Sequence, residues 1–261
     1  MFKFNNVIKR NLLLIVVAAN LFSCASKKDV VYFQDALNYE TIISDNSSDY
    51  RFKVDDVVGI HISTLDPEAS MAFNLFKGAE EGGIRPEQID YIIDKDGTID
   101  FPVLGSVKID GLSPSEVKTL LKEKLSKDYL KNPIINIRLK NFTVTILGEV
   151  NRPGTYPVNG EQITIFEALG LAGDLTIKGM RENIKVIRDF NGTKVYNTID
   201  LRTKKALESN VYYLTQNDVI YVEPNKSGVT ASSLDNRATI AASLAAALIT
   251  SAAIFLTRPN Q

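Results

Sequence analysis

The sequence predicts an α+β protein with two small modules and a C-terminal helix that crosses a membrane. Short β-branched segments alternate with single amphipathic helices through the middle of the chain, and 20 uncharged residues lie near its end. The length of 261 residues suits one or two domains, and the 44% hydrophobic content is typical of a globular chain. A net charge of −1 argues against a nucleic-acid partner held by bulk charge.

The N-terminus is typical of a secretory signal. Lys3, Lys9 and Arg10 precede an apolar run that is too short to span a bilayer. The run ends at Cys24, the only cysteine in the chain, in a Leu-x-Ser-Cys pattern that resembles a bacterial lipobox. This predicts a lipid on Cys24, and Ala25 in place of Asp favours the outer membrane. An ordinary signal peptide or an uncleaved anchor remains an alternative.

The 20 residues from 238 to 257 predict the membrane helix. Arg237 and Arg258 bracket this segment, and a helix of that length measures about 30 Å. Small and hydroxylated residues fall on one helical face, opposite bulky apolar residues such as Leu244 and Phe255. The hydroxyl stripe consists of Thr239, Ser243, Thr250 and Thr257. It favours a self-associating or lumen-facing helix, while a lone anchor and a buried core helix remain alternatives.

The first module begins at Tyr50 with a predicted strand at 57–62. A Pro- and Gly-rich stretch, 66–89, reads as an inserted loop, and Asp96-Gly97 predicts a hairpin between 91–93 and 99–101. Ser113 and Glu116 form a capping box that begins a helix. A half-buried strand follows Asn132-Pro133.

The second module begins near Phe142 and resembles a β-grasp sheet with one helix across it. Thr164 and Glu167 form a second capping box. The pattern from Tyr50 to Ile60 recurs from Tyr212 to Val222, with Asp56 and Asp218 at matching places. We interpret this echo as a repeated turn that leads into a strand. The Asn151–Gly154 turn is expected to expose Arg152 beside Tyr156.

Few residues support catalysis. One cysteine and one histidine cannot supply the ligands of a Cys/His zinc site, and no phosphate-binding glycine motif occurs. The Asp94-x-Asp96-Gly97 stretch lacks oxygen donors at the flanking positions of a calcium loop. His61 lies in an apolar strand and is expected to be structural. We therefore expect no catalytic, metal-binding or cofactor-binding residues.

The chain resembles the bacterial polysaccharide export proteins, in particular the outer-membrane lipoproteins. The resemblance rests on Cys24, Tyr50–Ile62, Asp94–Gly105, Gly111–Glu116, the strand after Pro133, Gly148–Tyr156, Ile165–Gly173 and Asn217–Val222. It implies an export domain followed by one soluble-ligand-binding β-grasp (SLBB) domain. It also implies that Arg152 and Tyr156 make a subunit or ligand contact, with a plain hairpin turn as the alternative. The family usually has Gly where this chain has Asp55, and well-known members carry more than one β-grasp domain.

The resemblance implies a subunit of an outer-membrane channel that exports capsule or exopolysaccharide. The subunits would form a homo-oligomeric ring with a pore of C-terminal helices. Its partners would be the polysaccharide, outer-membrane lipid and an inner-membrane co-polymerase or export partner. The expected segments are the signal 1–23, an extended arm 24–49, the export domain 50–142, the SLBB domain 143–224, a linker 225–237 and the membrane helix 238–257.

Two other functions remain open on the sequence alone. The chain could be a lipid-anchored periplasmic module that binds a glycan or acts as an adaptor, with the helix as a simple anchor. A glycan-cleaving enzyme is disfavoured because no site signature supports it.

Overall fold

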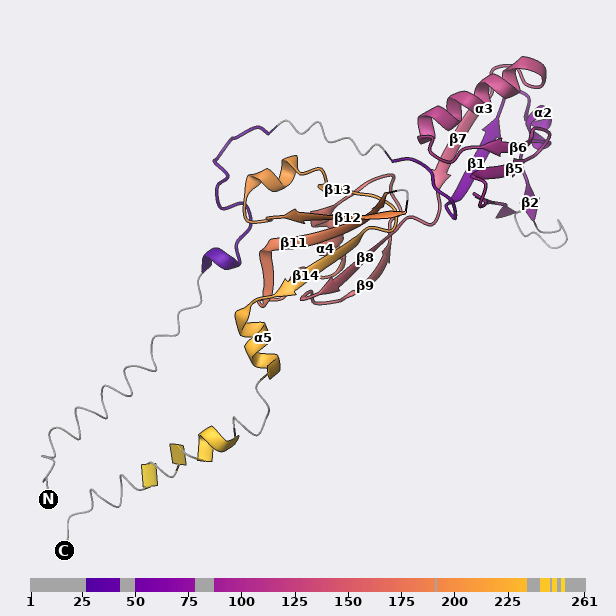
Figure 1. Cartoon of the computed structure of the whole chain (residues 1–261). Coiled ribbons are helices and arrows are strands. Elements are labelled where there is room, and N and C mark those ends of the chain that lie inside the picture. The colour runs from indigo at the N-terminus through magenta and orange to yellow at the C-terminus, as the bar shows by residue number, and fades with distance from the viewer. Residues whose placement is uncertain are drawn as a thin grey trace, which may run out of the picture.

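The computed structural model describes residues 27–42, 50–77, 87–190, 192–233, 240–244, 246–247 and 250–251. It contains two hydrophobic cores, one between Phe52 and Ile135 and one between Phe142 and Val222. Figure 1 shows them as two bodies joined by a short connection. We call them the first and the second module.

The first module has a three-stranded antiparallel sheet in the order β4-β1-β7. These strands are β1 (Val57–Ser63), β4 (Tyr91–Ile92) and β7 (Ile134–Leu139). Helix α3 (Pro114–Asp128) packs against β7 and buries Val117, Leu121 and Leu125. The predicted capping box is confirmed, because Glu116 N–H donates to Ser113 Oγ at 3.2 Å and Ser113 N–H donates to Glu116 Oε2 at 2.7 Å.

Two details of the first module differ from the sequence-based expectation. The segment after β1 forms helix α2 (Pro67–Met71) and a ladder between β2 (Phe76–Lys77) and β3 (Glu87–Gln88) instead of a plain loop. The hairpin ladder joins β5 (Thr98–Phe101) to β6 (Gly105–Lys108), whereas β4 pairs with β1. Asp96-Gly97 still makes a tight turn, since Asp94 accepts hydrogen bonds from the N–H groups of Asp96 and Thr98.

The second module has a five-stranded sheet in the order β12-β11-β14-β8-β9. Its strands are β8 (Thr143–Gly148), β9 (Gly154–Pro157), β11 (Gly179–Phe190), β12 (Thr193–Ile199) and β14 (Val219–Pro224). Strands β14 and β8 run parallel, and the other pairs are antiparallel. Helix α4 (Ile165–Leu171) buries Ile165, Ala168 and Leu169, and its capping box at Thr164 and Glu167 is confirmed.

Shorter elements complete the second module. Strand β10 (Ile163–Thr164) pairs with β13 (Tyr213–Leu214), and the 3₁₀ helix η2 (Lys204–Glu208) lies between β12 and β13. The 3₁₀ helix η1 (Lys27–Asp29) contacts β11, and α5 (Lys226–Ser233) follows β14. Both leave the module at the end far from the first module (Figure 1).

The arm before the first module is docked on the second module rather than free. Phe33 N–H and Gln34 N–H donate to the carbonyls of Leu201 and Arg202 at 3.4 and 2.7 Å. The Tyr32 ring lies 5.4 Å from the guanidinium carbon of Arg181, and the Phe33 ring lies 4.9 Å from that of Phe166. Tyr32 therefore packs against the core of a module that begins more than a hundred positions later in the chain.

The structure does not support the transmembrane helix that the sequence predicts over 238–257. Among the residues that the structure describes, no helix is long and apolar enough to cross a membrane.

Candidate functional site

The joint between the modules is built from the two turns that the repeated sequence pattern predicts, one before Asp56 and one before Asp218. Asp56 Oδ2 accepts a hydrogen bond from Lys53 N–H, and Asp218 Oδ2 accepts one from Thr215 N–H, at 2.8 Å in both turns. The residues before them, Asp55 and Asn217, have φ values of 70° and 65°. Asp and Asn tolerate this left-handed conformation better than most residues. The repeated turn is therefore confirmed.

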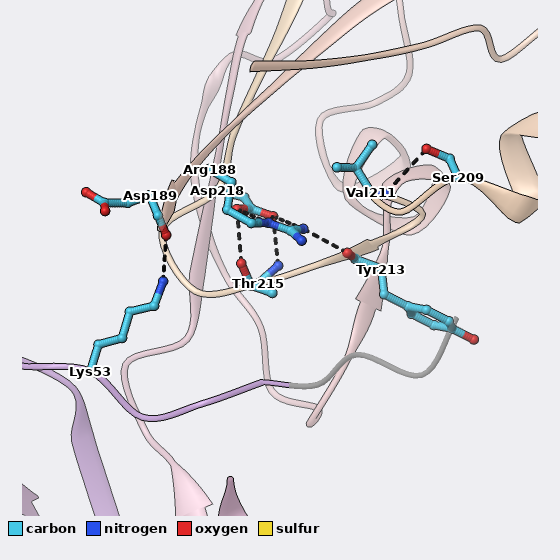
Figure 2. Close-up of polar contacts among 8 residues, drawn as sticks. All are labelled: Lys53, Arg188, Asp189, Ser209, Val211, Tyr213, Thr215 and Asp218. Atoms are coloured by element: carbon cyan, nitrogen blue, oxygen red, sulfur yellow. Dashed lines mark hydrogen bonds and ion pairs between the residues drawn. The ribbon is translucent and has the colours of Figure 1, made fainter. Parts of the chain in front are cut away.

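The two buried carboxylates have different second partners. Tyr50 donates its hydroxyl to Asp56, and burial raises the pKa of the Asp56 carboxyl, although this hydrogen bond opposes the shift. Asp218 is fully buried and forms an ion pair with Arg188, whose Nε and Nη2 donate at 3.0 and 2.7 Å. Arg188 Nη2 also donates to the carbonyl of Tyr213 at 3.0 Å (Figure 2).

Both turns hold the connection between the modules. The side chain of Asn141 accepts from Val57 N–H at 3.0 Å and donates to the carbonyl of Asp55 at 3.1 Å. From the other module, the Gln216 amide donates to the carbonyl of Asn141 at 2.6 Å and accepts from Thr143 N–H at 2.7 Å. The connection is thus bound to the first turn through the side chain of Asn141 and to the second turn through the side chain of Gln216.

Two further contacts cross the joint. Lys53, from the first module, donates through Nζ to the carbonyl of Asp189 on β11 at 2.8 Å (Figure 2). Leu139, at the end of β7, packs against the cores of both modules. We call the hydrogen bonds of Asn141 and Gln216 the clasp. The two further contacts add to it and restrict rotation of one module against the other.

A pocket of about 510 Å³ lies beside this connection. One wall comes from the start of α3 and the end of β7, and the opposite wall is the loop between β9 and β10. The lining consists of Tyr50, Ser113, Pro114, Ser115, Ile137, Arg138, Leu139, Phe142, Asn159, Gly160, Glu161 and Gln162. Apolar and polar groups are mixed, and the size is that of small-ligand pockets.

Arg152 and Tyr156 lie together on the predicted turn, away from this pocket. The Tyr156 hydroxyl donates to the carbonyl of Arg152. Arg152 donates through Nη2 to the carbonyl of Leu171 at 3.1 Å, and through its backbone N–H to the carbonyl of Ala172 at 2.9 Å. Arg152 therefore places its positive charge at the C-terminal end of α4, where the helix dipole favours it. This local role does not test the predicted contact.

The remaining predicted residues are scattered. Cys24, Thr239 and Thr257 lie outside the described residues. Ser243 donates its hydroxyl to the carbonyl of Ile240 at 2.8 Å, and Thr250 donates to that of Ala246 at 2.6 Å, so both are used within their own segment.

The structure offers little for metal or acid–base chemistry in its described part. His61 is exposed on β1, where we had expected a structural position. Within the described ranges, no three His, Cys, Asp or Glu residues are grouped so that they could hold a metal ion. The groups that the fold brings together at the joint are suited to hydrogen bonding and packing.

Sequence reasoning missed the residues that make the clasp. Asn141 and Gln216 carry no recognisable motif by themselves. The available signal was their position: Gln216 lies inside the repeated turn, and Asn141 lies in the short connection between two predicted strands.

Comparison with known families gives two adjacent matches. Residues 44–140 match the family of polysaccharide biosynthesis/export proteins, and residues 143–197 match the SLBB domain. The second match ends before β14, although this strand lies in the middle of the five-stranded sheet.

Two curated relatives share these regions. The chain is 24% identical over 145 residues to the EPS I polysaccharide export outer membrane protein EpsA of Ralstonia solanacearum. It is 25% identical over 147 residues to the protein of the same name from Ralstonia nicotianae. The matched stretches cover 54% and 53% of this chain but only 38% of each relative.

Proposed function

Because the chain belongs to the bacterial polysaccharide export proteins with an SLBB domain, we propose that it is a subunit of a conduit through which a polysaccharide leaves the cell. The conduit lies in the outer membrane, as the names of the two relatives suggest. The protein holds the route open and performs no bond chemistry.

The observation that carries this proposal is the clasped joint between the two family modules. A wall around a polymer must keep its shape while the polymer passes, and a freely rotating pair of modules would not. The hydrogen bonds of Asn141 and Gln216 hold the connection from both sides, and Lys53 adds a third link. A subunit of this kind suits repeated packing in a closed ring.

We propose a homo-oligomeric ring anchored by lipid on Cys24, with an inner-membrane co-polymerase or export partner delivering the polymer. Arg152 and Tyr156 are proposed as contacts to a neighbouring subunit or a ligand, because their turn lies at one edge of the sheet, beside the edge strand β9. Arg152→Glu should lower the native mass of the detergent-extracted assembly, while the matched variant Lys205→Glu should leave it unchanged. An assembly of equal mass in both variants would make the turn a plain hairpin.

The function itself is tested by in-frame deletion in the producing organism. Surface polysaccharide should be lost on deletion and should return when the full chain is supplied from a plasmid. A lipid-anchored glycan-binding module would predict little change in surface polysaccharide and a monomeric native mass.

A further inference from the structure

The pocket at the joint has an apolar side that is held in a fixed shape. Phe142 is 4% exposed, and Ile137 and Leu139 pack against the first core. Tyr50 is fixed by its hydrogen bond to Asp56 and by edge-to-face contact with Phe52, whose ring centroid is 5.5 Å away. The pocket therefore presents preformed apolar and aromatic surface to whatever enters it.

Backbone hydrogen-bonding groups also reach the pocket, from the free edge of β7. Strand β7 pairs only with β1 in its sheet. In β1, Ile62 directs its N–H and C=O to Asn74, at 2.9 and 2.8 Å, and therefore away from β7. Directions alternate along an antiparallel pair, and Ile62 is opposite Ile135. The N–H and C=O groups of Ile137 and Leu139 consequently point to the free edge that lines the pocket.

Four polar side chains at the mouth of the pocket have unused hydrogen-bonding capacity. Arg138, Asn159, Glu161 and Gln162 line the pocket and are exposed. None of these side chains makes a hydrogen bond or ion pair with any residue in the part of the chain that the structure describes. Together they provide both donors and acceptors, with one positive and one negative charge.

We propose that this pocket binds a glycosyl unit of the exported polysaccharide, an inference that rests on the proposed function. A sugar ring has an apolar C–H face and a rim of hydroxyl groups that both donate and accept. The apolar side of the pocket matches the first, and the backbone edge with the four side chains matches the second. The site gives the exported polymer a weak binding position on each subunit.

Two other kinds of occupant fit less well. A simple anion would need the N-terminus of α3, but the capping box there already uses the N–H groups of Ser113 and Glu116, and Glu161 adds negative charge nearby. An added peptide strand would need a longer free edge than Ile137 and Leu139, the two free-edge positions of β7 that line the pocket.

The test uses the full-length protein in detergent and oligosaccharides released from the organism's own polysaccharide by partial acid hydrolysis. Saturation-transfer NMR detects binding, and a titration gives the dissociation constant. Arg138→Ala and Gln162→Ala should each weaken binding, by about tenfold for the charged donor. Ser115→Trp should abolish it, because the indole would cover the pocket from an exposed position on α3. The matched controls, Lys122→Ala and Asn136→Ala, remove a cation and an amide outside the pocket and should bind as the wild type does.

Each outcome decides the proposal. Loss of binding in the pocket variants alone supports it, and circular dichroism must show that they remain folded. Equal binding by all variants would place the sugar elsewhere and overturn the proposal. No saccharide binding by the wild type would also overturn it, while surface polysaccharide in the deletion strain separately tests the export function. An endogenous peptide that mass spectrometry finds bound in the pocket would also overturn the proposal. It would show that the pocket binds a peptide strand instead of a sugar.

Discussion

Asp56 and Asp218 stabilise the same kind of turn at two distant places in the chain. Each buried carboxylate accepts a hydrogen bond from the backbone N–H three residues before it, and each is followed directly by a central strand. The same two turns hold Asn141 and Thr143, so the repeated device that begins β1 and β14 also joins the modules. The repeated turn thereby contributes to the geometry of the joint between the two modules.

The Asp56 carboxyl should give a recognisable pH dependence of stability. Burial raises its pKa in the folded state above the ordinary value of 3.8, so the folded state holds this proton more tightly than the unfolded state. Its contribution to stability is complete below the unfolded pKa and is lost as pH rises through the raised folded pKa. The free energy of unfolding of the wild type, minus that of Asp56→Asn, should therefore fall as the pH rises from below 3.8 through the raised folded pKa.

Urea unfolding of both proteins at each pH gives this difference. Taking the difference removes the opposite trend from Asp94 and Glu116, whose pKa values are lowered by hydrogen bonds from backbone N–H groups. A difference that stays flat or rises with pH would show that burial does not raise the pKa of Asp56.

Asn141→Ala should loosen the joint without unfolding either module. The variant loses two hydrogen bonds and leaves the N–H of Val57 without its partner, at a cost of about 2 kcal/mol. Spin labels at Lys118→Cys and Thr198→Cys, in a Cys24→Ser background, report the distance between the modules. We expect a broader distance distribution than in the parent, whereas Asn136→Ala, which removes an exposed amide of β7, should leave it narrow. Equal widths would mean that the clasp is not what fixes the joint.

Gly148 in the second module and Gly105 in the first provide a matched pair of glycine-to-alanine substitutions. Both have a left-handed φ, +91° and +71°, but a Cβ on Gly148 would lie 2.0 Å from the carbonyl oxygen of Val222, and one on Gly105 would meet nothing within 4 Å. Gly105→Ala should cost only the backbone strain, about 1 kcal/mol. Gly148→Ala should cost about 3 kcal/mol or more, because β8 and β14 must also separate. Chemical denaturation measures both, and similar losses would refute the close approach of the two strands.

The docked arm should stabilise the second module through Tyr32. Its ring covers Arg181, which is 4% exposed, and its hydroxyl donates to Asp174. Tyr32→Phe should lose about 1 kcal/mol and Tyr32→Ala about 2–3 kcal/mol, since only the latter also loses the ring. Tyr39, which is fully exposed in the same arm, supplies the control. A melting temperature that Tyr32→Ala leaves unchanged would mean that the arm is not part of the module.

Local signals predicted local structure well. The capping boxes at Ser113 and Thr164 were recognised because their residues are three positions apart. The echo around Asp56 and Asp218 was recognised because each turn is short and self-contained. Nothing in the sequence pattern of Tyr32 indicates that it lies on Arg181, since this contact depends on tertiary packing.

Neither the pocket at the joint nor the outcome for the membrane segment could be predicted from local sequence patterns. The pocket combines Tyr50, the start of α3, the end of β7 and the loop at Gly160, which meet only when both modules are folded. The predicted membrane helix relied on an uncharged composition between 238 and 257. Composition measures hydropathy along the chain, and among the residues that the structure describes no helix is long and apolar enough to cross a membrane.

The most direct test of the export account is where the polymer accumulates when the chain is removed. Polysaccharide should be quantified separately at the cell surface and in the periplasm of an in-frame deletion strain, with and without the plasmid-borne chain. Because the protein is proposed to act after synthesis, the deletion should lower surface polymer while polymer is still made and is retained inside the outer membrane. Surface polymer at the wild-type level in the deletion strain would contradict the account.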